Sequence, residues 1–141
     1  MKKLNRKGFT LIELLAVIVI LAIVMVVTIP SVLNSMESAR QKQFENAIHS
    51  IEEYVQKNYD LCKVGGILTD AGNYDASIFS DTSTCTLKTN TTVITAAGYK
   101  TDDIASVTGA VNTNGKYVIS TATAGANGQF KGATFDTNPN P

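Results

Sequence analysis

The chain has 141 residues and a mass of 15.0 kDa, which leaves room for one small domain and one dedicated segment. Its 12 Lys and Arg balance 12 Asp and Glu, so the composition excludes a strongly basic protein that binds polyanions such as DNA through bulk charge. Four basic residues, Lys2, Lys3, Arg6 and Lys7, precede a long apolar run, and the rest of the chain is therefore acidic, with 8 basic and 12 acidic residues.

The apolar run extends from Phe9 to Ile29 and reads FTLIELLAVIVILAIVMVVTI, which is 21 residues. As a helix it covers about 30 Å, the thickness of the hydrocarbon core of a bilayer. The next basic residue after the four leading cations is Arg40. The positive-inside rule therefore predicts a single-pass segment with a cytoplasmic N-terminus and an exported remainder.

Glu13 is the one ionisable residue in this run. An acidic residue at the centre of a membrane helix costs about 2.5 to 3.5 kcal/mol, and less near an end, so this carboxylate needs a partner. In one interpretation the partner is Arg6 or Lys7 of the same chain. In another it is a positive charge that the intact chain does not contain.

The segment KGFTLIELL resembles the class III signal of type IV prepilins and pseudopilins, with a short basic leader, Gly8, an aromatic Phe9, Thr10, two aliphatic residues and Glu13. The resemblance implies that a membrane-embedded aspartyl prepilin peptidase cuts between Gly8 and Phe9 on the cytoplasmic side and N-methylates the new Phe9 amine. The absence of a side chain at Gly8 suits an extended backbone in a narrow peptidase site.

Cleavage at this junction creates a positive charge at Phe9. The resemblance implies that Glu13 pairs with this amine on a neighbouring subunit while the filament grows. Pairing removes the penalty of an isolated carboxylate in a low-dielectric bundle and selects an axial register. We therefore expect Glu13 to act in assembly.

Two other interpretations of the N-terminal segment fit less well. A secretory signal peptide has an apolar core of about 7 to 15 residues and a small-residue cleavage site, and the sequence IPSVLNSMESA after the longer core here lacks a convincing site. A plain single-pass anchor explains the length and the charge bias but leaves Glu13 and the Gly8–Phe9 junction unexplained.

Pro30 lies where the apolar run ends, and it predicts either a kink or melted stretch, or simply a proline at the membrane interface. In the type IV pilins that the chain resembles, a proline at this place borders a segment that unwinds during assembly. Beyond it the helical period resumes to about residue 59, for a total of roughly 50 residues and 75 Å. Its apolar positions, spaced by three and four, are Leu33, Met36, Phe44, Ala47, Ile48, Ile51, Tyr54 and Val55.

Cys62 and Cys85 fall on the exported, oxidising side, which predicts a disulfide between them. Two unpaired thiols in a small core are the alternative. A metal site fits less well because His49 is the single histidine of the chain. The bridge would close a loop worth about 3 kcal/mol in the chain-entropy model.

From about residue 60 the composition turns to Thr, Ser, Gly, Asn and Ala, which predicts a β-rich head. Gly65 and Gly66 mark a turn, residues 67–82 a loop, and TCTLK around Cys85 a short strand. An antiparallel meander is expected, with a hairpin at Asn114 and Gly115; its strands are Ile104–Val111, Lys116–Thr121 and Gln129–Phe135. The predicted fold class is α+β, a long helical spine packed on a small antiparallel sheet, as in pilins.

No catalytic or nucleotide-binding motif is present, so we expect neither an enzyme nor a cofactor or metal. The final DTNPNP resembles the start of a calcium loop but lacks its glycine and distal Glu. Residues 60–141 contain five Lys and seven Asp, which argues against direct nucleic-acid binding.

The chain is therefore predicted to be a structural subunit of a type IV pilus or pilus-like filament, with a pseudopilin of a type II secretion or competence DNA-uptake system, or a minor pilin, as alternatives. Its segments are a cleaved leader (1–8), a transmembrane and polymerisation helix (9–29), an amphipathic continuation (30–59) and an exported head (60–141). Expected partners are like or related pilin subunits, the prepilin peptidase, an inner-membrane assembly platform and, before assembly, lipid. The expected location is the cell membrane, followed by a cell-surface filament.

Overall fold

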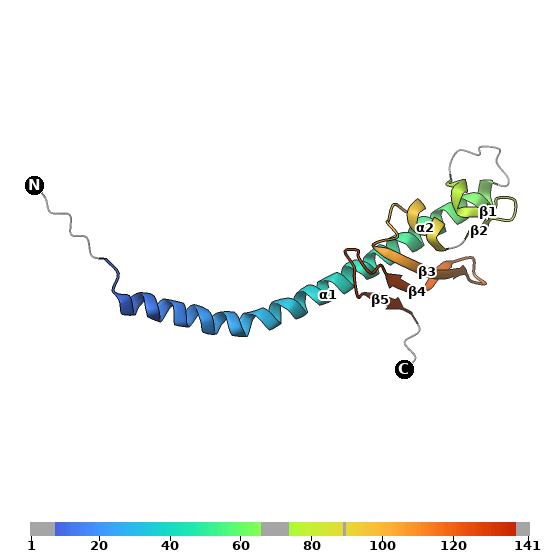
Figure 1. Cartoon of the computed structure of the whole chain (residues 1–141). Helices are drawn as coiled ribbons and strands as arrows, with labels where there is room; N and C mark the ends of the chain where they lie inside the picture. Colours follow the sequence, from blue (N-terminus) through green and yellow to red (C-terminus); the bar gives the residue numbers. More distant parts are fainter. Residues whose placement is uncertain (1–7, 66–73, 89, 138–141) are drawn as a thin grey trace, which may run out of the picture. The chain divides into compact units, whose positions relative to one another are not determined.

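The computed structural model describes residues 8–65, 74–88 and 90–137. The chain divides into two compact units, residues 1–38 and 39–141, and each is described by itself. One long helix, α1 (Leu11–Gly65), precedes a set of short strands and helices (Figure 1). The α+β class and the long helix with small antiparallel sheets are confirmed, and they are consistent with a pilin fold.

In the first unit every described side chain, from residue 8 to residue 38, is exposed. Helical structure continues through Pro30, although proline has no N–H for the helix hydrogen bond. A melted stretch at Pro30, one of the expected alternatives, is therefore absent from the single chain. Leu33 and Met36, predicted to lie on the apolar stripe, are exposed as well.

In the second unit α1 buries one face. Phe44, Ala47, Ile48, Ile51 and Val55 are buried, as their spacing predicted, and Tyr54 is half-buried. The helix ends at residue 65 instead of 59, because the buried stripe continues through Asn58 and Cys62. The first residues assigned to the head thus belong to the helix.

A three-stranded antiparallel sheet packs on this face, in the order β3 (Ile104–Val111), β4 (Tyr117–Ala124) and β5 (Thr134–Asp136). The predicted hairpin is confirmed: Val111 pairs with Tyr117, and Gly115 in the connecting loop has a φ of 79°. The side chain of Asn112 organises the loop by accepting hydrogen bonds from the N–H groups of Asn114 and Lys116.

The third strand is much shorter than predicted, since residues 125–133 form a loop. Gly125 and Gly128 back directly onto the backbone of Asp102, where a Cβ on either glycine would clash. Asp103 also holds this loop, because its backbone carbonyl oxygen accepts from Gly125 N–H and its carboxylate accepts from Gln129 N–H. The close approach explains why glycine is needed at these two loop positions, and the loop also takes in residues 129–133 of the predicted strand.

A short helix, α2 (Asn90–Ala96), was not predicted from the sequence. Its Thr and Val content favours a strand, but Val93 and Ile94 on one side of a helical turn enter the core. The helix ends in a Schellman motif: Tyr99 N–H donates to the carbonyl of Ile94, Gly98 N–H donates to that of Thr95, and Gly98 has a φ of 88°. Tertiary burial and this cap outweigh the strand propensity.

Polar side chains of α1 form hydrogen bonds with backbone groups of the sheet that no neighbouring strand pairs. Gln56 accepts a hydrogen bond from Tyr117 N–H (2.5 Å), and Glu52 accepts one from Ile119 N–H (2.6 Å), where β4 extends beyond β5. Gln41 bonds both backbone polar groups of Thr134 in β5. These contacts fix the sheet along the helix and block the free edge from other strands.

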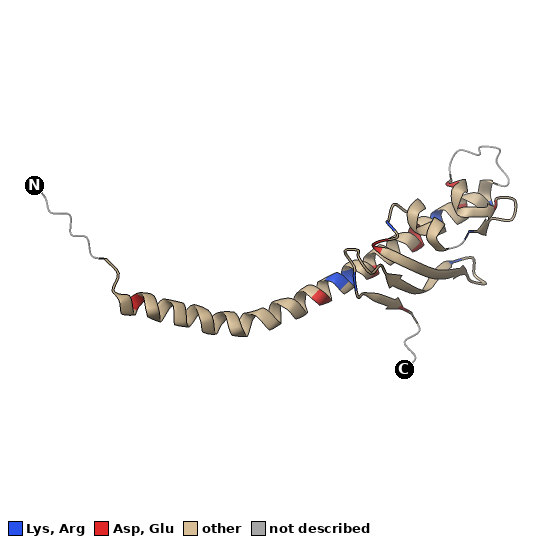
Figure 2. Ribbon diagram, viewed as in Figure 1, with Lys and Arg blue, Asp and Glu red and all other residues tan. Residues whose placement is uncertain are grey.

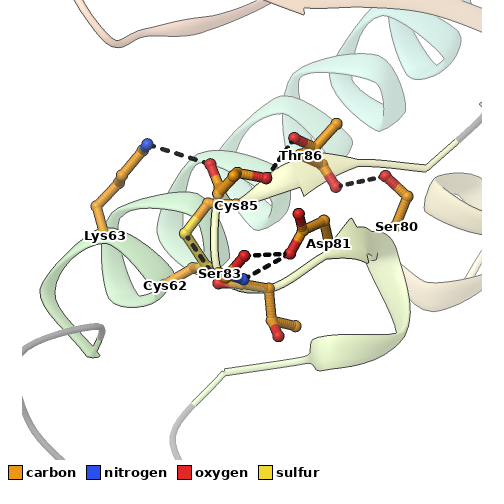
Figure 3. Close-up of a disulfide and its surroundings, with 9 residues drawn as sticks. Cys62, Lys63, Ser80, Asp81, Ser83, Cys85 and Thr86 are labelled. Carbon is orange, nitrogen blue, oxygen red and sulfur yellow. Dashed lines mark hydrogen bonds between the residues drawn. A yellow bond between two sulfur atoms is a disulfide. The ribbon is translucent and has the colours of Figure 1, made fainter.

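A second, smaller core lies at the C-terminal end of α1 and consists of Cys62, Cys85, Ile78 and Phe79. Ile78 belongs to the 3₁₀ helix η1 (Ala76–Ile78), which is followed by the antiparallel pair β1 (Phe79–Asp81) and β2 (Thr86–Leu87). Cys62 and Cys85 form a disulfide in the structure, which ties β2 to the helix (Figure 3). Gly66 and residues 67–73 of the expected turn and loop lie outside the described residues, and the rest of that loop contains η1 and β1.

A hydrogen-bonded cluster joins α1 to the segment before β1. Tyr54 donates from its hydroxyl to Asp75 Oδ2 (2.6 Å), and the N–H of Asp75 donates to the side-chain oxygen of buried Asn58 (2.7 Å). Burial, and then the hydrogen bond and charge of Asp75, raise the pKa of Tyr54 to about 12. Hydrogen bonds from Ser77 and then Tyr54 lower the pKa of Asp75.

This cluster predicts a loss of stability at alkaline pH. An unfolded chain releases the Tyr54 proton near pH 10, whereas the folded chain retains it to about pH 12, so the contribution of Tyr54 is present below pH 10 and is lost between pH 10 and 12. We expect Tyr54→Phe to flatten the fall of the unfolding free energy across this window, measured by urea unfolding of the full chain in micelles. Tyr59→Phe is the matched control, and an unchanged slope in Tyr54→Phe would contradict the assignment.

Candidate processing and assembly site

The expected cleavage junction lies just outside the helix. Gly8, Phe9 and Thr10 precede the first residue of α1, and all three are exposed, Phe9 to 90%. Nothing lies within 4 Å of a Cβ placed on Gly8. The Gly8–Phe9 peptide bond therefore lies outside the helix, and no part of residues 10–65, 74–88 or 90–137 covers it.

Thr10 and Glu13 form a reciprocal capping box at the start of α1. Thr10 N–H donates to Glu13 Oε2 (3.0 Å), and Glu13 N–H donates to Thr10 Oγ1 (3.3 Å). The N–H of Leu14 donates to the backbone oxygen of Thr10, which closes the first helical turn. Glu13 thus has a role within its own chain that was not predicted, although the T-x-x-E spacing before an apolar run is the pattern that indicates it.

Only one oxygen of the Glu13 carboxylate takes part in this box. Among the residues that the structure describes, none donates to Oε1, and the side chain is exposed in the single chain. An ionised carboxylate can accept several hydrogen bonds, so Oε1 remains available to a second donor. Arg6 and Lys7, the possible partners within the chain, lie outside the described residues.

The helix that follows is an exposed apolar surface. Between residues 8 and 36, Glu13 is the only charged residue, and the ribbon of the first half of α1 in Figure 2 is accordingly almost free of the colours that mark charged residues. Within the described parts of the chain, one helix is long and apolar enough to cross a membrane. Its composition and exposure indicate membrane anchoring.

The other predicted site residues are distributed over both units. Pro30 lies inside α1 in the first unit, whereas Cys62 and Cys85 lie in the second. No group of three or more His, Cys, Asp or Glu side chains that could hold a metal ion occurs among the described residues. Gly8, Phe9 and Glu13 are thus the residues that the structure brings together at one end of the helix.

The capping box gives a prediction for the intact chain. Thr10→Val keeps the shape of the side chain but removes the acceptor for Glu13 N–H, at a local cost of about 1 kcal/mol. We expect hydrogen exchange of the Glu13 amide, followed by NMR in micelles, to accelerate about fivefold. Thr10→Ser, which keeps the hydroxyl, should exchange like the parent chain, and equal rates in Thr10→Val would contradict the capping role.

Comparison with known proteins finds a family match at the same end of the chain. A family model described as the prokaryotic N-terminal methylation motif matches residues 3–29. The ComG operon protein 3 homolog of Bacillus licheniformis is 36% identical over 52 residues, which cover 37% of this chain and 54% of the relative.

The chain thus spans about half the length of this curated relative. No solved structure matches the chain significantly. The match to the methylation motif confirms a prepilin-type N-terminal motif at residues 3–29, and the chain is homologous over 52 residues to ComG operon protein 3.

Proposed function

We propose that this chain is a structural subunit of a type IV pilus or pilus-like filament. The observation that carries the proposal is the long apolar helix that begins two residues after the Gly8–Phe9 junction, whose side chains are all exposed from residue 11 to residue 38. Burying such a surface requires lipid or other subunits. A structural role of this kind calls for no catalytic centre.

The local geometry of the junction supports processing at this place. Gly8 and Phe9 lie before the capped start of α1, so a prepilin peptidase could bind the peptide bond without first unwinding the helix. Cleavage after Gly8 exposes the amine of Phe9, and methylation leaves that nitrogen able to carry a positive charge. The capping box would then hold the new N-terminus one residue before the helix cap.

Glu13 is proposed to pair with the Phe9 amine of a neighbouring subunit. Its Oε2 accepts from Thr10 N–H, which orients the carboxylate, and its Oε1 is available to the incoming ammonium. In a helix bundle or in lipid the two charges are poorly screened, so their attraction is strong. A subunit at an axial position that breaks the pair is therefore disfavoured. Pro30, which lacks a helix hydrogen bond, marks the place where α1 would unwind as subunits pack.

Before assembly, the same helix would anchor the subunit in the cell membrane with the N-terminus in the cytoplasm and the second unit exported. The basic residues before Gly8 and the absence of others until Arg40 support this orientation. Assembly would then move the helix from lipid into contact with like or related subunits, with the help of an inner-membrane platform.

A pseudopilin of a competence DNA-uptake system is the second candidate, and the homology to ComG operon protein 3 favours it. A pseudopilin of a type II secretion system or a minor pilin uses the same helix and processing site. The excess of Asp over Lys in residues 60–141 argues that DNA, if handled by such a filament, is bound by another subunit. Electron microscopy of cells with and without this chain separates a major subunit from a minor one.

The pairing of Glu13 gives a direct test. Glu13→Gln keeps the size of the side chain but removes the charge, so we expect filament yield to fall about tenfold or more, the effect of losing roughly 1.4 kcal/mol per contact. Yield is measured by immunoblotting and electron microscopy of sheared filaments. Glu37→Gln, at another exposed glutamate of α1, is the control and should assemble normally. Normal filament yield from Glu13→Gln would contradict the proposal.

A further inference from the structure

A groove of about 290 Å³ lies between α1, the segment after α2 and the β4–β5 loop, entirely within the second unit. The helix lines it with Gln43, Asn46, Ala47 and Ser50, at the spacing of one helix face. Tyr99, Gln129 and Phe130 complete the opposite side. The lining contains no charged side chain, although α1 is rich in charged residues elsewhere in this unit.

The polar groups in the groove are free to bind a ligand. Within the described parts of the chain, no residue hydrogen-bonds the side-chain amides of Gln43, Asn46 or Gln129, or the hydroxyl of Tyr99. The hydroxyl of Ser50 donates to the backbone carbonyl of Asn46 (2.9 Å) and can still accept. Each amide offers both a donor and an acceptor, so the groove matches a ligand whose groups also do both.

The walls of the groove are fixed by the fold. Phe130 is buried and packs on Phe44, with ring centroids 5.6 Å apart. Tyr99 is half-buried and is held at its backbone by the Schellman motif that ends α2. The backbone N–H of Gln129 is bonded to Asp103 Oδ1 (2.9 Å). The aromatic surface and the backbone that carries Gln129 are thus positioned before any ligand arrives.

We infer that this groove binds a neutral saccharide. Sugar hydroxyls both donate and accept hydrogen bonds, which suits three free amides and two hydroxyls, and the C–H face of a sugar ring can stack on Tyr99. The volume lies just below the usual range of ligand sites, so a saccharide would occupy the groove with part of its surface in solvent. Nucleotides and acidic ligands are disfavoured, because no cationic side chain lines the groove.

The inference is independent of filament assembly, because all lining residues belong to the second unit. The test is a ¹⁵N NMR titration of the full chain with maltotriose and, separately, with tri-N-acetylchitotriose. The micelles are formed from a zwitterionic detergent, since detergents with sugar headgroups would compete. We expect saturable shifts of the side-chain amide signals of Gln43, Asn46 and Gln129 with at least one of these saccharides.

Variants assign the shifts to the groove. Gln43→Ala and Asn46→Ala, both at exposed positions, should each weaken binding by roughly three- to tenfold, the effect of losing one net hydrogen bond. Tyr99→Phe isolates the contribution of the hydroxyl. Asn127→Ala, at an exposed asparagine outside the groove, is the matched control and should bind like the parent chain.

Two results would overturn the inference. One is the absence of saturable shifts with both saccharides, or shifts that the groove variants leave unchanged. The other is a dependence of the same amide signals on protein concentration without sugar, which would identify a second copy of the chain as the occupant of the groove.

Discussion

One physical constraint dominates the structure: the apolar first half of α1 is exposed in the single chain and has to be buried. Every described side chain from residue 8 to residue 38 faces outward, and almost all of the first half of α1 is apolar. Water is a poor environment for this surface, so lipid or other subunits must cover it. Membrane anchoring and the proposed polymerisation both bury this surface, and we propose that the carboxylate of Glu13 makes the contact between subunits specific.

The second unit stabilises the other half of the same helix by different means. An apolar stripe from Phe44 to Val55 packs on the sheet and α2, while Glu52 and Gln56 accept hydrogen bonds from N–H groups of β4 that β5 does not pair. The disulfide and the Tyr54–Asp75 cluster hold the end of the helix. Because α1 contributes to both cores of this unit, the helix and the head fold together.

The sequence predicted best the features that depend on a repeated apolar spacing or on a residue pair with a strong conformational preference. Apolar spacing predicted the buried face of α1, and the Asn–Gly pair predicted the β3–β4 hairpin. The errors arose where tertiary contacts decide the outcome. The helix α2 forms despite β-branched residues because Val93 and Ile94 enter the core. The predicted loop before β5 extends through residues 129–133, where Gln129 N–H is bonded to Asp103 instead of to a neighbouring strand. The cap at Thr10 was predictable from its spacing, but the same Glu13 also has the pattern of a membrane charge, which hides its local role.

The central claim is that the Gly8–Phe9 junction and Glu13 belong to one assembly mechanism, which begins with cleavage. Tandem mass spectrometry of the protein isolated from the cells that produce it tests this most directly. We expect a mature N-terminus at Phe9 with one methyl group on its amine. A mature protein that begins at Met1, or one cut beyond the apolar helix, would contradict it.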